Sequence, residues 1–195
     1  MCSSDLGGMF FDYDNDGDPD IIAANGTAEE LILQYPLLLE NDGKGNFRDV
    51  GKEKGDYFRE KRSGRGLALI DYDNDGDMDI VISHVDKKAT TALLRNDGGN
   101  SNHWLGLMLK GKNGPAAAIS ARVTIKAGDM RQVLINQWAT GYLSANDQRL
   151  HIGLGKNKKI DSIEIKWSDG TMEVYYNILC DRHITIEQGK GILEN

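Results

Sequence analysis

Ten aspartates lie in two nine-residue stretches whose spacing suits a hard divalent cation. Asp12-Tyr-Asp-Asn-Asp-Gly-Asp-Pro-Asp20 recurs as Asp71-Tyr-Asp-Asn-Asp-Gly-Asp-Met-Asp79. Calcium binds oxygen, and a loop with carboxylates at positions 1, 3, 5 and 9 and a carbonyl at 7 can surround one ion. We therefore predict two calcium ions. Their expected ligands are Asp12, Asp14, Asp16, Asp18 and Asp20 in one loop and Asp71, Asp73, Asp75, Asp77 and Asp79 in the other, with Asp18 and Asp77 acting through their carbonyls.

Two other interpretations of these stretches are weaker. An EF-hand needs a Glu at position 12 and helices on both sides. Position 12 is Ala23 in one copy and Ile82 in the other, and apolar strand-like runs flank both. Solvated acidic turns are the plainer alternative. It is disfavoured because both copies place a glycine, Gly17 or Gly76, at position 6, where the chain turns sharply.

The elements that must position these loops form a repeat. Each acidic loop lies between two short apolar runs, and a third run ending in Asn-Asp-Gly follows further on. In the first copy Asn46–Val50 supplies a fourth run. Short apolar runs separated by Gly, Asn and Asp are typical of strands and turns. Four strands per repeat indicate a propeller blade, and about two such blades form only part of a ring.

The second half of the chain has a different pattern. Seven strand candidates follow one another: His103–Lys110, Ser120–Ala127, Arg131–Trp138, Arg149–Leu154, Ser162–Trp167, Met172–Ile178 and His183–Glu187. This spacing favours a β-sandwich-like domain. We expect Trp104, Trp138 and Trp167 to lie in cores, and Ala28–Tyr35 is the one segment with a helical pattern. The predicted fold is therefore all-β: a partial β-propeller of about two blades, then a β-sandwich-like domain.

These motifs carry a family resemblance. Asp-x-Asp-x-Asp-Gly-x-x-x-Asp between two strands resembles the FG-GAP or VCBS repeat, a calcium-binding propeller blade. Downstream motifs, in the same order, are similar to the ASPIC/UnbV domain that follows such blades in the cartilage acidic protein family and its bacterial relatives. They are Asn102–Gly106, Ala121–Thr124, Gly141–Ser144, Asn146-Asp147 with Arg149–His151, Gly153–Gly155 and Ile163–Gly170.

One position departs from this family, and the resemblance also gives the domain boundaries. Ile119-Ser120 stands where the family usually has Ile-Gly, and if that glycine holds a special backbone angle, the turn here must differ. The expected domains are 7–99 for two blades and 100–195 for the ASPIC/UnbV-like part. Residues 1–6 depart from the repeat and are expected to be a non-native scar left on a C-terminal fragment.

Composition limits the function classes. The formal charge of −7 is concentrated in the two loops, and no Lys/Arg cluster stands out, which argues against a nucleic-acid partner. No apolar run is long enough to span a bilayer. His151, near Asp147 and Arg149, is expected to have a structural role, as is the Gly141–Gly155 segment, although that segment could alternatively bind a ligand. Cys180 is expected to be a buried small hydrophobe.

The resemblance implies a secreted, periplasmic or cell-surface location and calcium binding, and no known reaction. We therefore expect a non-enzymatic adhesion or ligand-binding module, whose partner is an extracellular protein or a glycan. The alternative is the non-catalytic part of a propeller enzyme that acts on polysaccharide, with its active site on other blades.

Overall fold

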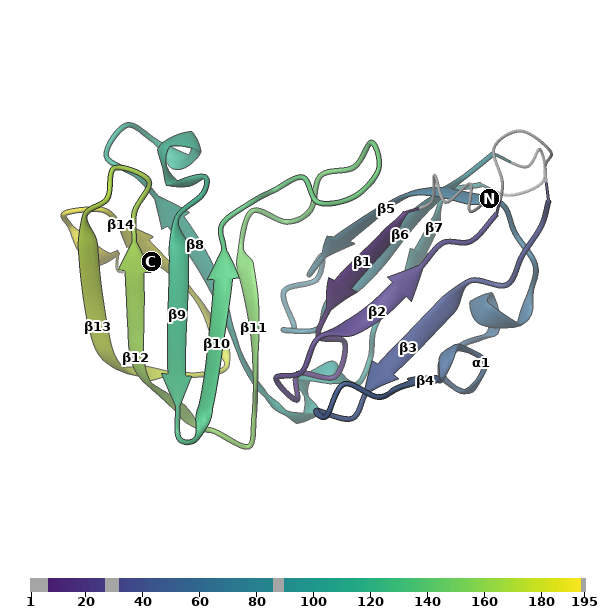
Figure 1. Ribbon diagram of the computed structural model, residues 1–195, viewed down its shortest axis with the longest axis horizontal. Coiled ribbons are helices and arrows are strands. Elements are labelled where there is room, and N and C mark those ends of the chain that lie inside the picture. The colour runs from purple at the N-terminus through teal and green to yellow at the C-terminus, as the bar shows by residue number, and fades with distance from the viewer. Residues whose placement is uncertain (1–6, 27–31, 86–89, 194–195) are drawn as a thin grey trace. The chain divides into compact units, whose positions relative to one another are not determined.

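The computed structural model describes residues 7–26, 32–85 and 90–193, and strands dominate these ranges (Figure 1). The predicted all-β fold is confirmed. The expected non-native segment, residues 1–6, lies outside the described residues. No helix in the described ranges is both long and apolar enough to cross a membrane.

Contacts divide the chain into two compact units. Unit 1 contains the described residues up to Tyr13, together with Asp18–Asp97 and Ala139–Asn146. Unit 2 contains Asp14–Gly17, Gly98–Trp138 and the described residues from Asp147 onward. The short segments 14–17 and 139–146 thus belong to a different unit from the residues on either side of them in sequence. The sequence pattern does not indicate this assignment.

Unit 1 holds the two repeats as two antiparallel sheets. The first sheet has the order β1 (Gly8–Phe11), β2 (Asp20–Ala23), β3 (Leu37–Asn41) and β4 (Phe47–Asp49). The second has the order β5 (Gly64–Ile70), β6 (Asp79–His84) and β7 (Ala92–Leu94). Two short helical turns, α1 (Gly51–Lys54) and the 3-10 turn η1 (Asp56–Arg59), lie between the sheets in sequence. Alternating strand residues such as Met9, Phe11, Leu67 and Leu69 are buried in one shared core.

One expectation for unit 1 is confirmed and another needs correction. The repeat pattern gave a fourth strand only in the first copy, and the second sheet has three strands, since the described chain after β7 enters the 3-10 turn η2 (Gly99–Ser101). The segment with a helical pattern lies partly outside the described residues. Its described part, 32–35, is not helical, since Gln34 and Arg62 exchange backbone hydrogen bonds of 2.9 Å in an isolated antiparallel bridge.

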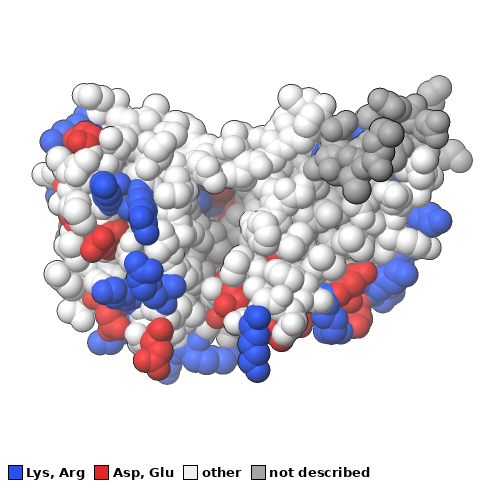
Figure 2. All heavy atoms as spheres, in the orientation of Figure 1, with Lys and Arg blue, Asp and Glu red and all other residues white. Residues whose placement is uncertain are grey.

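Unit 2 is a sandwich of two four-stranded sheets. One sheet has the order β10 (Met130–Ile135), β9 (Arg122–Ala127), β12 (Lys159–Lys166) and β13 (Met172–Leu179). The other has the order β11 (Leu150–Gly155), β8 (His103–Lys110), β14 (Arg182–Glu187) and β15 (Gly191–Leu193), with β8 and β14 parallel. A 3-10 turn, η3 (Pro115–Ala118), precedes β9. Figure 2 shows Lys and Arg side chains gathered in two groups on the outer face of the first sheet.

The buried residues of unit 2 agree with most of the predictions made from the sequence. Inward residues of both sheets, such as Leu107 and Ile163, are fully buried against each other. Trp104 and Trp167 are buried as expected. The prediction for Trp138 is wrong, because β10 ends at Ile135 and the indole is only partly buried.

Ser120, the residue that departs from the family pattern, has an unusual backbone conformation. Its φ is 71°, in the left-handed region that favours glycine, and its amide donates to the Asn136 carbonyl at 2.8 Å. Whether the turn differs from that of the family stays a prediction. The serine adopts the glycine-type conformation with its strain.

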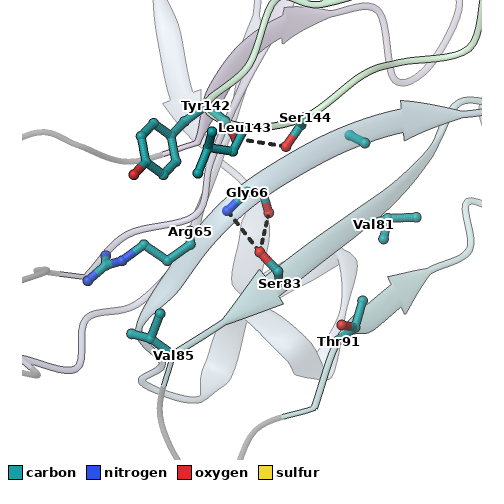
Figure 3. A pocket seen from close by; sticks show the side chains of 10 residues that line it. Arg65, Gly66, Val81, Ser83, Val85, Thr91, Tyr142, Leu143 and Ser144 are labelled. Atoms are coloured by element: carbon teal, nitrogen blue, oxygen red, sulfur yellow. Dashed lines mark hydrogen bonds between the residues drawn. The ribbon is translucent and has the colours of Figure 1, made fainter.

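The segment Ala139–Asn146 lies on unit 1 through Asn146, whose Oδ1 accepts from the Leu69 amide at 3.0 Å. Its tip is exposed, with Leu143 87% accessible at a φ of 47°. Together with β5, β6 and Thr91 it lines an open pocket of about 530 Å³ (Figure 3). The hydroxyl of Ser83, which lines this pocket, accepts from the Gly66 amide at 2.9 Å. The ligand role suggested for this segment stays a prediction.

Candidate metal centre

The two acidic stretches form the loops of two equivalent hairpins. The first joins β1 to β2 and the second joins β5 to β6. Strand register pairs Phe11 with Asp20 and Ile70 with Asp79. The first aspartate of each loop follows directly on that pair, so the two ends of each loop lie next to each other.

The last aspartate of each loop fastens the loop to the sheet. Asp20 is 2% exposed, and its carboxylate accepts from the Tyr13 amide at 3.1 Å and the Asn41 amide at 2.8 Å. Asp79 is fully buried and accepts from the Tyr72 amide at 3.2 Å and the Asn96 amide at 2.8 Å. Both carboxylates therefore hold the Asn-Asp-Gly turn of their repeat beside the loop.

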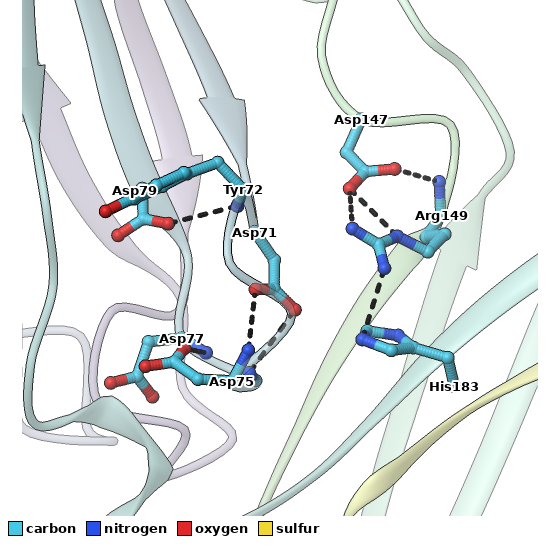
Figure 4. Close-up of polar contacts among 9 residues, drawn as sticks. Asp71, Tyr72, Asp75, Asp77, Asp79, Asp147, Arg149 and His183 are labelled. Carbon is cyan, nitrogen blue, oxygen red and sulfur yellow. Dashed lines mark hydrogen bonds and ion pairs between the residues drawn. The ribbon is translucent and has the colours of Figure 1, made fainter.

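The second loop curls back on its own amides (Figure 4). The Asp71 carboxylate accepts from the amides of Asp75 at 3.1 Å and Gly76 at 3.3 Å, and Asp75 accepts from the Asp77 amide at 3.0 Å. The turn uses positive φ at Asn74, 60°, and at Gly76, 92°, and the first loop repeats these values at its equivalent residues. The predicted sharp turn at position 6 is confirmed.

Three carboxylates converge in each loop. One oxygen from each of Asp12, Asp14 and Asp20 lies within 4.8 Å of the other two, and the same holds for Asp71, Asp73 and Asp79. Two oxygens that each lie about 2.3–2.6 Å from one calcium ion are at most ~5 Å apart. The residues therefore fit a hard cation bound by oxygen, and these acidic clusters could hold metal ions.

Electrostatics make the clusters costly without a cation. Two carboxylates about 4 Å apart repel each other by ~1 kcal/mol in water and by more in a lower dielectric. Burial raises the pKa of the Asp79 carboxyl above its usual range, against hydrogen bonds from two amides, and nearby Asp73 and Asp75 raise it further. A bound divalent ion would offset this repulsion and favour the ionised form.

The structure thus brings six of the ten predicted ligands together, at positions 1, 3 and 9. Asp16 and Asp75, at position 5, are not among the converging carboxylates. The Asp18 carboxylate instead lies against Gly43, where an added Cβ would come within 2.5 Å of its Oδ2. Asp77 is fully buried. Metal ligation by these residues stays a prediction.

Unit 2 contains a second polar cluster, on the strands β8, β11 and β14. Arg149 donates to the Asp147 carboxylate through Nε at 2.9 Å and to His183 Nε2 at 3.1 Å (Figure 4). His151 stacks on Trp104, with ring centroids 6.3 Å apart. Burial lowers the pKa of His151 to about 4, and the nearby His183 and Arg149 contribute in the same direction. This geometry agrees with the structural role expected for His151.

The same unit holds the apex of the first acidic loop. Asn15 is 1% exposed, its carbonyl accepts from the Gly155 amide at 2.8 Å, and its Oδ1 accepts from His151 Nε2 at 2.5 Å. Asn102 Nδ2 donates to the Asp14 carbonyl at 2.9 Å. Sequence reasoning missed these contacts, since no local pattern links residues so far apart.

Comparison with known proteins finds a match for each part of the chain. Residues 12–82 match the FG-GAP-like repeat, and residues 111–193 match the family described as ASPIC and UnbV. Neither description names a reaction. Cartilage acidic protein 1 of Mus musculus is 29% identical over 199 residues, covering 94% of this chain and 27% of that protein. The Homo sapiens protein of the same name is 28% identical over 177 residues, covering 83% of this chain and 24% of that protein. The chain therefore spans about a quarter of these relatives' length, and the predicted resemblance is confirmed.

Proposed function

We propose that this chain, which joins an FG-GAP-like repeat to an ASPIC and UnbV domain, is a calcium-stabilised, non-catalytic binding module. One observation carries the proposal: the loops of two equivalent hairpins each bring three carboxylates to the spacing that one calcium ion requires. Each ion would be structural, because its ligands tie the two strands of a hairpin together.

The location follows from the same chemistry. Oxygen-only loops of this kind in extracellular modules bind calcium with affinities of about 10⁻⁴ to 10⁻³ M. Such sites fill where free calcium is millimolar, which suits a secreted, periplasmic or cell-surface protein. The similarity to proteins named cartilage acidic protein 1 supports this assignment. The partner we propose is an extracellular protein or glycan.

Calorimetric titration of the whole chain with calcium chloride tests the metal sites. The unchanged protein should bind two ions, Asp12→Ala and Asp71→Ala should each bind one, and the double variant none. Asp129→Ala is the matched control, because it removes an exposed aspartate outside both loops and should still bind two ions. Absence of uptake by the unchanged chain, or undiminished uptake by the double variant, would refute the proposal.

A stability measurement checks that the ions act structurally. Calcium at about ten times its dissociation constant should stabilise the fold by ~1.4 kcal/mol per site. Thermal unfolding in calcium and in EDTA measures this difference. A chain that takes up calcium without any rise in unfolding temperature would contradict the structural role.

A further inference from the structure

The outer face of the sheet β10-β9-β12-β13 carries an unusual arrangement of charges. Strand register aligns its outward residues in three rows across the sheet. The rows are Arg131–Lys126–Ser162–Tyr176, Val133–Thr124–Glu164–Val174 and Ile135–Arg122–Lys166–Met172. The two groups of basic side chains in Figure 2 lie on this face.

Two of these cross-strand pairs place like charges opposite each other. Arg131 faces Lys126, and Arg122 faces Lys166. Directly opposed like charges destabilise a sheet. None of the four cations forms an ion pair with another residue in the described ranges, and all four are exposed. The sequence itself hides this pattern, because strand register decides which of these residues face each other, and Lys166 is 44 residues after Arg122.

The face differs in charge from the rest of the chain. Within these three rows, four cations against the single carboxylate of Glu164 leave three positive charges, whereas the whole chain has a net charge of −7. The two cationic pairs are four residues apart along β9, which corresponds to roughly 13 Å at a strand rise of about 3.3 Å per residue. A ligand that neutralises both pairs must therefore be an extended polyanion.

Apolar side chains at the two edges of the face narrow the ligand class. Tyr176 is 67% exposed and Met172 58%, both on the edge strand β13, and Val133 and Ile135 are exposed on β10. An exposed tyrosine beside aliphatic groups offers a surface on which the apolar face of a sugar ring can pack. A linear acidic polysaccharide supplies both the repeated anions and such rings.

We propose that this face binds an acidic polysaccharide, with carboxylate or sulfate groups held by the two cationic pairs and a sugar ring packed on Tyr176. The inference deepens the proposed binding role and rests on it, but it uses no residue of the acidic loops. The ligand's anions would relieve the repulsion between the paired cations. Binding should therefore weaken as salt screens the charges.

Binding to immobilised polygalacturonate, heparin and neutral dextran tests the inference with the whole chain in calcium. Both acidic polymers, or one of them, should bind at low salt and dextran should not, and the comparison tells carboxylate from sulfate recognition. The double variant Arg122→Ala/Lys166→Ala should bind at least tenfold more weakly. Lys44→Ala/Lys112→Ala removes the same charge from exposed lysines elsewhere and should bind like the unchanged protein.

The unfolding temperature of each variant controls for loss of folding. Removing one like-charge pair should leave the unfolding temperature unchanged or raise it, so weaker binding cannot come from unfolding. Tyr176→Ser should weaken polysaccharide binding while calcium uptake stays at two ions.

Two outcomes distinguish this inference from the proposed metal sites. Calcium uptake without binding to either acidic polymer overturns this inference alone, and binding without calcium uptake overturns only the metal sites. Binding to anionic phospholipid vesicles or to nucleic acid in place of the polymers would also overturn it.

Discussion

Acidification should destabilise unit 2 through His151. The imidazole is partly exposed and stacks on Trp104, and its Nε2 donates to the Asn15 side-chain oxygen, an arrangement that favours the neutral ring. Its pKa falls from an ordinary 6.5 to about 4, chiefly because burial penalises the charged ring. An unfolded chain has no such burial and takes up the proton as the pH falls below the ordinary value.

The sign and size of the effect follow from linkage. Between pH 6.5 and about 4 the unfolded state binds a proton that the folded state does not, so the free energy of unfolding falls as the pH falls. Above this window His151 contributes no pH dependence. The full loss, reached below about pH 4, corresponds to the pKa difference and is about 3 kcal/mol, a large part of the ~5–15 kcal/mol that stabilises a typical domain.

Urea denaturation followed by tryptophan fluorescence measures this loss, since all three tryptophans belong to unit 2. His151→Gln keeps a donor toward Asn15 but cannot titrate, and should lose about 3 kcal/mol less than the unchanged chain between about pH 7 and pH 4. Equal pH dependence in His151→Gln and the unchanged chain would refute the reasoning, as would an NMR titration midpoint of His151 near its ordinary value.

Three further predictions concern single side chains. Asp79→Ala removes the acceptor of two partly buried amides and should destabilise the calcium-free chain by about 1–3 kcal/mol, whereas exposed Asp73→Ala should leave stability in EDTA unchanged or raise it, because it removes a repelling carboxylate; equal losses would contradict this. Gly106→Ala would place a Cβ 2.0 Å from His183 Nδ1 and should lower the free energy of unfolding, measured by urea denaturation, by ~1–3 kcal/mol. An unchanged urea midpoint would contradict this prediction. Ser120→Gly relieves a left-handed serine and should raise stability by about 1 kcal/mol; a lower unfolding temperature would count against it.

The sequence predicted those features whose cause is local. An Asp-x-Asp pattern with a glycine at position 6 determines a turn, and alternating apolar residues determine strands, so the hairpin loops and most strands are where the pattern indicated. Trp138 failed because a run of strand-forming residues does not reveal where strand pairing ends. The backbone angle of Ser120 could not be read from the sequence, since the surrounding turn imposes on a serine the conformation that glycine adopts freely.

Features that depend on strand register could not be predicted from the sequence. Lys126 and Arg131 are separated by a tight turn, but Arg122 and Lys166 become neighbours only when β9 pairs with β12. A charge count along the chain finds no basic cluster there. A single-residue shift in register would turn every side chain of a strand to the other face, so this basic surface exists only because the buried alternation of Val123, Ile125 and Ile163 fixes the pairing.

The two acidic loops also differ in a way that their sequences do not reveal. Their residues are nearly identical, yet Asn15 is buried and held by His151 and Gly155, whereas its counterpart Asn74 is exposed. Ordering the backbone of one residue costs about 1–2 kcal/mol. Where tertiary contacts already fix the apex, an ion does not have to supply that free energy, and one such residue corresponds to roughly a tenfold difference in affinity. If both loops bind calcium as we propose, their identical aspartates give the same metal preference, and the fixed apex should make the first loop the tighter site.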